Sequence, residues 1–424
     1  MAQLIQPVRG MNDILPEQNA GWETIESVAT AIFDAYGYYR IRIPIVERTD
    51  LYRRSIGEKT DIVEKEMYTF DDRNGDSLTL RPEATAGIVR AGLSHGMFHN
   101  QQQKLWCSGP MFRHERPQKA RYRQFNQLSL EAIGFENPEV DAELIVMSAR
   151  LWERLGLESP ILEINSLGTL ASRSKYRDAL VSYFDSFRQL LDGDSLRRLE
   201  TNPLRILDSK NPQLEELISG APELSDYLDV ESSNHFERVQ HLLDDVKVKY
   251  VLNPHLVRGL DYYSRTVFEW VTDRLGAQSA ICSGGRYDGL VAQLGGRDMP
   301  AVGWALGMER VVELMAAEGC QAAAQLPDAY LVMAGDDARR RGFGIAEKLR
   351  SAVPGLLLSF DCVAGSIKAQ LKRADRSGAR LALILGDDEL AAGRISVKAL
   401  RKQIPQESLK LEELIARLIS ESAH

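Results

Sequence analysis

Two strand-like segments, residues 104–112 and 123–133, are separated by one short charged loop, and this spacing is the feature that most constrains the fold. Parallel neighbours need a crossover of about a dozen or more residues, so we expect the two segments to pair antiparallel. Further strand-like runs at 38–45 and 77–80, with a helical stretch at 22–36, surround them. The first part of the chain therefore predicts an antiparallel sheet with flanking helices and excludes a doubly wound nucleotide fold.

The middle of the chain predicts a helical insertion. Residues from about 171 to 246 are rich in charge, carry leucines spaced by three and four, and are interrupted by Asn-Pro and Ala-Pro steps. Strand-like sequence returns at 249–252 and 266–271, and a helix is expected near Gly307. The sheet is thus expected to be completed from both sides of the insertion.

The last hundred or so residues follow a different pattern. After a joint at 319–327, strand-like and helical segments alternate, which is typical of a separate α/β domain with a largely parallel sheet. We therefore expect two domains, residues 1–325 and residues 326–424.

Composition excludes several classes of protein. The chain has 424 residues, 44% hydrophobic and 26% charged, which is typical of a globular protein, and no apolar run approaches the ~18 residues that span a bilayer. The four cysteines lie far apart without a CxxC pair, so neither a disulfide framework nor a thiolate zinc site is indicated. We expect a cytoplasmic protein. The net charge of −8 argues against a polyanion as partner, although a mildly basic C-terminal part follows an acidic body.

Common fingerprints of nucleotide and hydrolase sites are missing. The sequence has no G-x-G-x-x-G after a strand, no G-x-x-x-x-G-K-[ST], no HExxH and no G-x-S-x-G elbow. His95 and His99 are spaced to share a metal, but no third ligand lies near them in the sequence. Any chemistry must come from other segments.

The strand at 123–135 alternates in a way that indicates either a wet face or the floor of a pocket. With a period of two, one face carries Phe125, Gln127, Ser129, Glu131 and Ile133. A carboxylate and an amide on the floor of a pocket would fix the orientation of a polar ligand.

Arginine and lysine residues crowd around a proline in the loop at 112–123. A solvated charge run is one interpretation. Guanidinium forks also match phosphate oxygens, so the loop is a candidate to hold a triphosphate, a nucleic-acid end, or both.

Three further segments carry weaker signals. Pro82 fits the first turn of a helix, where Glu83 would either complement the helix dipole or bind an ammonium group. The glycine-dense run 282–289 indicates a turn or a close approach of backbone to ligand. The segment 303–310 places glycines beside a strand-to-helix passage that ends at Arg310.

Taken in order, these segments resemble the histidyl-tRNA synthetases of class II along essentially the whole chain. The segments at 42–47, with Pro44, at 112–131 and at 303–310 resemble class II motifs 1, 2 and 3. The segments LVRGLDYY at 256–263 and GGRYDG at 284–289 resemble two signatures specific to the histidine enzymes.

The resemblance implies an α+β fold, with a six-stranded antiparallel catalytic sheet, flanking helices and a helical insertion over 1–325, and an anticodon-binding α/β domain over 326–424. It implies that L-histidine is joined to tRNA(His) through a histidyl-adenylate, with ATP as substrate and Mg2+ accompanying the β- and γ-phosphates. No metal is assigned to protein side chains. Motif 1 implies a homodimer, and no membrane partner is expected.

The resemblance also implies roles for individual residues. Arg113 would bind the α-phosphate and the substrate carboxylate, Arg258 would lie near the α-phosphate, where other class II enzymes use a metal ion, and Arg310 would bind the far end of ATP. Other residues would form the histidine pocket: Glu83, Thr85 and Gln127 at the ammonium group, and Glu131, Tyr262, Tyr263 and Tyr287 around the imidazole. The tRNA acceptor end would face Arg116, Gln118 and Arg123.

Two alternatives remain open at this point. One is a catalytically silent, synthetase-like regulatory subunit of ATP phosphoribosyltransferase, but such paralogues lose signature residues and lack the C-terminal domain. The other is an adenylate-forming ligase with an acceptor other than tRNA, against which the retained C-terminal domain counts.

Overall fold

The computed structural model describes residues 4–58, 60–207, 209, 211–276, 280–320, 326–362 and 365–422. The joint expected at 319–327 lies partly outside these residues. The described contacts divide the chain into two compact units, residues 1–322 and 323–424. Among the described residues, no helix has the length and apolar character needed to cross a membrane.

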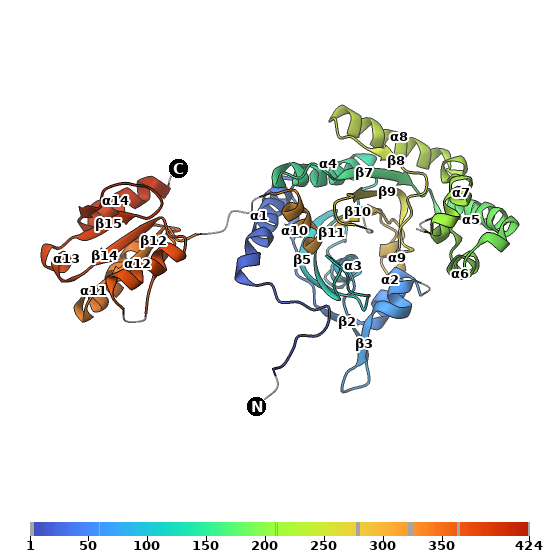
Figure 1. The fold of residues 1–424 in the computed structure, drawn as a ribbon. Coiled ribbons are helices and arrows are strands. Elements are labelled where there is room, and N and C mark those ends of the chain that lie inside the picture. The colour runs from blue at the N-terminus through green and yellow to red at the C-terminus, as the bar shows by residue number, and fades with distance from the viewer. Residues whose placement is uncertain are drawn as a thin grey trace. The chain divides into compact units, whose positions relative to one another are not determined.

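A large mixed sheet forms the centre of the first unit (Figure 1). Its strands, in spatial order, are β1 (Tyr39–Arg40), β5 (Gln103–Phe112), β6 (Gln124–Ile133), β11 (Ala301–Gly307), β10 (Ala280–Arg286), β9 (Ser264–Val271), β7 (Ile161–Ser166) and β8 (Val251–Leu252). The six strands from β5 to β7 pair antiparallel throughout. The two-residue strands β1 and β8 are parallel additions at the edges. The predicted six-stranded antiparallel sheet and the hairpin of β5 and β6 are therefore confirmed.

Helices cover one face of this sheet completely. They are α1 (Asn19–Ala35), α4 (Pro138–Leu155), α8 (Val230–Asp245) and α10 (Met308–Ala317). Leu128, Leu130 and Ala132 of β6 are fully buried in the core that these helices share with the sheet. Because alternate residues point to opposite faces, Gln127, Ser129 and Glu131 lie on the other face, as the alternation predicted.

The opposite face is only partly covered, and this is where cavities lie. The helices on this side are α2 (Thr49–Ile56), α3 (Thr85–Ser94) and α9 (Leu290–Gln293), next to a small antiparallel sheet of β2 (Val46–Arg48), β4 (Ser77–Leu80) and β3 (Tyr68–Asp71).

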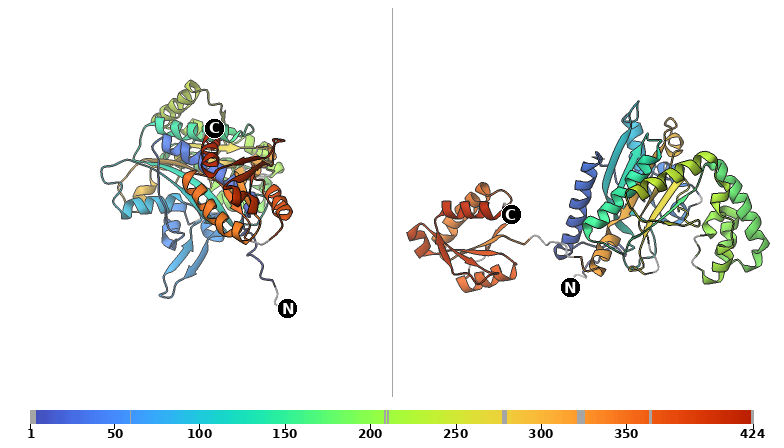
Figure 2. Two further views of the ribbon diagram at one scale, coloured as in Figure 1. Left: turned by 90° about the vertical axis from the view of Figure 1, so that its left-hand side faces the viewer. Right: turned by 90° about the horizontal axis from the view of Figure 1, so that it is seen from above.

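The insertion is helical, as predicted, and extends beyond one edge of the large sheet (Figure 2). It contains α5 (Leu170–Ser186), α6 (Gly193–Thr201) and α7 (Glu215–Ser219) and leads into α8. Short turns of other helix types are η1 (Pro16–Gln18), η2 (Ile62–Glu66), η3 (Arg188–Leu190), η4 (Pro203–Ile206), η5 (Pro212–Leu214) and η6 (Leu224–Tyr227).

Two strand predictions in the first unit need correction. The run at 38–45 pairs as a strand only over Tyr39–Arg40. Pro44 has no N–H to donate to a strand ladder. The carbonyl of the preceding residue, Ile43, instead accepts a hydrogen bond from Arg81 Nη1 at 3.0 Å. The glycine-dense run at 282–289 is not mainly a turn, because residues up to Arg286 form strand β10 in the middle of the sheet.

The second unit is an α/β domain with a five-stranded sheet in the order β13 (Leu358–Phe360), β12 (Ala329–Met333), β14 (Leu381–Leu385), β15 (Ile395–Ala399) and β16 (Glu407–Leu409). Its helices are α11 (Asp336–Ala352), α12 (Ile367–Arg376), α13 (Asp387–Ala392) and α14 (Leu411–Ser422). The sheet is mixed, because β15 and β16 pair antiparallel. The prediction of a largely parallel sheet is wrong here: the short connection through α13 is not long enough for a crossover.

Gly284 of strand β10 lies where neighbouring strands leave no room for a side chain. A Cβ placed on Gly284 would meet Trp304 Cβ at 2.5 Å and Phe268 Cζ at 2.9 Å, whereas one on Gly289 meets nothing within 4 Å. Gly284→Ala should therefore lower the free energy of unfolding by about 1–3 kcal/mol, measured by chemical denaturation. Gly289→Ala, in the same run, is the control and should change it by less than about 0.5 kcal/mol. Equal effects of the two substitutions would contradict the packing described here.

Candidate active site

Two adjoining cavities open on the partly covered face of the large sheet. The first has a volume of about 180 Å³ and the second about 200 Å³. Arg113, Gln127, Ser283 and Ala305 line both of them. The shared wall means that two ligands, or two parts of one ligand, can meet there.

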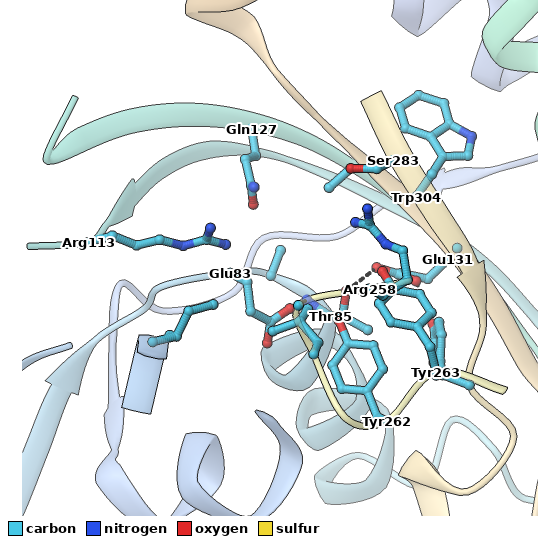
Figure 3. A pocket seen from close by; sticks show the side chains of 17 residues that line it. Glu83, Thr85, Arg113, Gln127, Glu131, Arg258, Tyr262, Tyr263, Ser283 and Trp304 are labelled. Atoms are coloured by element: carbon cyan, nitrogen blue, oxygen red, sulfur yellow. Dashed lines mark hydrogen bonds between the residues drawn. The ribbon is translucent and has the colours of Figure 1, made fainter. Parts of the chain in front are cut away.

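The first cavity contains the eight residues that the family resemblance assigned to the amino-acid substrate, together with Arg258, which it placed near the α-phosphate; the eight are Glu83, Thr85, Arg113, Gln127, Glu131, Tyr262, Tyr263 and Tyr287. They come from the segment before α3, the hairpin of β5 and β6, the segment before β9, and the turn after β10. Figure 3 shows the side chains of Arg113, Gln127 and Glu83 directed into the same space. The structure therefore brings this group together.

Glu131 lies at the floor of the first cavity and is 1% exposed. Thr85 donates a hydrogen bond from Oγ1 to Glu131 Oε1 at 2.6 Å, and the Tyr287 hydroxyl donates to Oε2. Burial raises the pKa of Glu131 to about 8, although the two hydroxyl donors oppose the shift. Each carboxylate oxygen keeps acceptor capacity, so Glu131 can still receive a hydrogen bond from a ligand.

Glycine at position 303 makes room for this carboxylate. Gly303 of β11 lies directly opposite Glu131 of β6 in the ladder, and a Cβ there would collide with the Glu131 carboxylate. The glycine of this segment is thus explained by the close approach of a side chain to the backbone.

Glu83 lies just before α3, not within its first turn. Its carboxylate accepts hydrogen bonds from the backbone N–H of Thr85 at 2.6 Å and of Ala86 at 2.9 Å, so it caps the helix. Burial raises the pKa of Glu83, against the effect of these donors and of Arg113. The helix-dipole interpretation is confirmed, and the carboxylate also lines the cavity.

Gln127 has an orphaned atom at this site. Its Oε1 is buried and has no hydrogen-bond partner among the described residues. A buried acceptor without a partner is costly, so this atom is a candidate to meet a donor on a ligand.

Three tyrosines form an aromatic wall. The ring centroids of Tyr262 and Tyr263 are 4.7 Å apart, and those of Tyr262 and Tyr287 are 5.5 Å apart with the rings edge to face. Burial raises the pKa of all three hydroxyls, so they remain neutral donors.

Two arginines bring positive charge to the first cavity. Arg113 donates from Nε to the Pro82 carbonyl at 2.9 Å and lies over the Phe125 ring at 5.3 Å. Arg258 donates from Nη1 to Glu269 Oε1 at 2.6 Å and lies over the Tyr263 ring at 5.4 Å. Burial lowers the pKa of Arg113, whereas in Arg258 the Glu269 carboxylate and Tyr263 together outweigh burial and raise the pKa.

The second cavity is lined by Arg310, as expected, together with Arg113, Arg121, Phe125 and Glu309. Arg121 forms an ion pair with Glu115. Glu309 accepts hydrogen bonds from the Asn126 backbone N–H at 2.8 and 3.0 Å, and burial raises its pKa to about 7. The cavity is thus cationic, with its acidic residues already engaged.

The three residues predicted at the tRNA acceptor end do not line either cavity. Arg116 and Gln118 are exposed on the loop between β5 and β6, and Arg123 is partly buried, donating from Nε to the Glu115 carbonyl at 3.1 Å. Their predicted role stays a prediction.

Several contributors to the site could not be assigned a role from the sequence: Glu269, Ser283, Arg121 and Glu309. Glu269 had a detectable signal, since it is the one charged residue in the apolar run at 266–271. Arg121 belonged to the charged loop that was singled out, but nothing in the spacing separated it from its neighbours.

An antiparallel six-stranded sheet that carries two adjoining cavities, with arginines from the loop of β5 and β6 and from the start of α10, defines a class II aminoacyl-tRNA synthetase. Comparison with known proteins gives the specific group. The family model "Histidyl-tRNA synthetase" matches residues 10–311, and the model "Anticodon binding domain" matches residues 328–421.

Similar proteins agree with this family. The histidine–tRNA ligase of Hydrogenovibrio crunogenus is 54% identical over 99% of this chain and 98% of its own. That of Halorhodospira halophila is 56% identical over 98% of this chain and 97% of its own. The apo histidyl-tRNA synthetase of S. aureus has a TM-score of 0.82 at 38% identity and covers 98% of this chain and 100% of its own. The chain belongs to the histidyl-tRNA synthetase family.

The buried Glu131 predicts a specific pH dependence of stability. Its pKa is about 8 in the folded protein against an ordinary 4.5, so the folded state binds more protons than the unfolded chain between these values. Glu131 should therefore lower the free energy of unfolding as the pH rises from about 5 to 8. We expect Glu131→Gln to remove at least about 1 kcal/mol of this decrease, measured by denaturation of the ligand-free protein at pH 6 and pH 9. Parallel pH profiles for wild type and variant would contradict the assignment.

Proposed function

We propose that this chain attaches L-histidine to tRNA(His) at the expense of ATP, through a histidyl-adenylate, with the first cavity holding histidine and the second holding ATP. The observation that carries the proposal is the buried Glu131 carboxylate beneath three tyrosines, directly beside a cavity lined by arginines. The regulatory-subunit alternative is not favoured, because the signature residues and the C-terminal domain are both present.

Recognition of the imidazole is assigned to Glu131 with Tyr262, Tyr263 and Tyr287. The ring of histidine carries two nitrogens, and the buried Glu131 carboxyl group can accept a hydrogen bond from the N–H donor of one of them. A competitor without this donor would leave Glu131 without a ligand partner, and such sites discriminate strongly.

The α-ammonium group is assigned to Glu83, Thr85 and Gln127. The Glu83 carboxylate supplies charge, and the orphaned Gln127 Oε1 supplies an acceptor. In this assignment the substrate carboxylate would lie beside Arg113, which lines the wall shared by the two cavities, toward ATP.

The chemistry follows from this placement. A carboxylate oxygen of histidine attacks the α-phosphorus, a new P–O bond forms, and the bond to pyrophosphate breaks. Arg113 and Arg258 neutralise charge on the α-phosphate, and Arg310 binds the far end of ATP. Glu269 holds one side of the Arg258 guanidinium. In the second step a terminal ribose hydroxyl of tRNA attacks the carbonyl carbon, and AMP leaves with its electron pair.

Mg2+ is proposed to arrive with ATP, bound to the β- and γ-phosphates. No group of three or more His, Cys, Asp or Glu side chains that could hold a metal occurs within the described residues. This fits an ion that is bound mainly through substrate phosphates and water. No step is assigned to a metal held by the protein.

The remaining partners follow from the same proposal. Residues 1–325 would act as the catalytic domain and residues 326–424 as the anticodon-binding domain. The exposed loop with Arg116, Gln118 and Arg123 would face the acceptor end of tRNA, where cations neutralise phosphate. A homodimer through the motif 1 region and a cytoplasmic location complete the proposal.

ATP–pyrophosphate exchange with each of the twenty amino acids, followed by charging of total tRNA in the same preparation, tests this function. We expect exchange with histidine alone and transfer to tRNA, because only histidine carries two ring nitrogens that the pocket can satisfy together. Exchange without transfer would indicate another acceptor. Histidine binding without exchange would assign the protein to the regulatory class.

A further inference from the structure

A buried ion pair lies on the far side of the sheet from the cavities. Asp141 of α4 and Arg286 at the end of β10 are both 0% exposed. Arg286 donates from Nε to Asp141 Oδ1 at 3.2 Å, and its Nη2 contacts Asp141 Oδ2. Neither residue lines the first or the second cavity.

Every part of the Arg286 guanidinium is held. Its Nη1 donates to the Phe135 carbonyl at 2.9 Å and to Asp288 Oδ1 at 3.2 Å, and its Nη2 donates to the Asn137 carbonyl at 3.4 Å. His235 of α8 adds a contact from Nε2 to Asp141 Oδ1 at 3.3 Å. Although burial opposes ionisation, Arg286 keeps the pKa of Asp141 below its usual value, so the pair is charged.

The next residue along the chain, Tyr287, points to the opposite side and reaches the pocket floor. Its hydroxyl donates to Glu131 Oε2, and its backbone N–H donates to the Ala301 carbonyl at 2.7 Å. The pairing register with β9 shifts between Gly285 and Arg286, whereas the pairing with β11 continues in regular register to Arg286 and Val302, so the ladder holds this turn from one side only. The ion pair adds a second constraint, from α4, on where Tyr287 leaves the sheet.

Stability alone is a weak reason for such a pair. Replacement of buried ion pairs by apolar residues of similar volume is often neutral or stabilising, whereas a fully hydrogen-bonded network fixes one geometry. Loss of the Asp141 charge would free Arg286 to move, and the Tyr287 hydroxyl would move with it.

We infer that Asp141 is a positioning residue of the histidine pocket: through Arg286 it fixes Tyr287, and through Tyr287 it orients the Glu131 carboxylate. This inference rests on the proposed function, in which Glu131 receives the imidazole. Asp141 acts from a helix that has no contact with the substrate.

The test measures the KM for histidine, the KM for ATP and kcat in pyrophosphate exchange for Asp141→Asn, Tyr287→Phe and the double variant. We expect Asp141→Asn to raise the KM for histidine by about tenfold and the KM for ATP by less than about twofold. If Asp141 acts through Tyr287, the KM for histidine of the double variant should not exceed the higher of the two single-variant values, because the effects of coupled residues are not additive. Multiplied effects in the double variant, or equal changes in both KM values, would overturn the inference.

Ser148→Ala is the matched control on the same helix. Ser148 is 0% exposed and accepts a hydrogen bond from Trp270 Nε1 at 2.8 Å, but it has no link to Tyr287. It should lower the melting temperature without a selective change in the KM for histidine. A selective rise in the KM for histidine with Ser148→Ala would show that any loosening of α4 suffices and would overturn the role of Asp141.

A milder variant and one comparison keep the test decisive. If Asp141→Asn fails to fold, Arg286→Lys keeps the charge but loses the paired contacts, and the same changes in KM are expected. If Tyr287→Phe alone leaves the KM for histidine unchanged, the pocket assignment itself fails. If Tyr287→Phe raises it and the variant of the ion pair does not, only the positioning inference fails.

Discussion

The buried carboxylate of Glu131 is the interaction on which the rest of the site depends. A carboxylate in an apolar interior is costly unless its oxygens are satisfied, and here Thr85 and Tyr287 donate to them from two different segments. The neighbouring strand must carry glycine at position 303 to leave space for it. One buried carboxyl side chain thus links the start of α3, the turn after β10 and the glycine of β11.

The two cavities divide charge in a way that matches their proposed ligands. Two carboxyl groups and three tyrosines line the first, which suits the cationic group and ring of an amino acid, and Arg113 and Arg258 line it as well. Arginines line the second, which suits phosphate oxygens. Arg113 lines both cavities, at the point where we propose that the carboxylate of one substrate meets the α-phosphate of the other. Catalysis then rests on positioning and on neutralisation of developing charge, without a covalent enzyme intermediate.

Much of the fold could be predicted because the signals were local. The hairpin of β5 and β6 follows from loop length, and the two faces of β6 follow from its alternation. The structure of the run at 282–289 was harder to predict, because glycines that make room for neighbouring strands have the same sequence pattern as a turn. The antiparallel edge of the second unit could not be predicted either. The short helix α13, with Gly393 as its C-cap, connects β14 directly to an antiparallel neighbour and not to a parallel one.

The residues of the site also fall into two groups, those that could be assigned from the sequence and those that could not. Glu131, Glu83 and Arg310 belong to motifs that identify a family, so they could be assigned from sequence. The Glu269 partner of Arg258 and the Asp141 partner of Arg286 could not, because each pair joins segments that only the folded sheet brings together. Residues that contact a site residue without lining the cavity follow no fixed spacing in the sequence.

The most direct measurement of the central claim is a calorimetric titration of L-histidine into wild-type protein and into Glu131→Gln, with unfolding curves recorded for both. If Glu131 receives the imidazole, the variant should stay folded and bind histidine at least about a hundredfold more weakly, because the carboxyl group that accepts the imidazole N–H in a buried site is lost. A folded variant that binds histidine with near wild-type affinity would contradict the account.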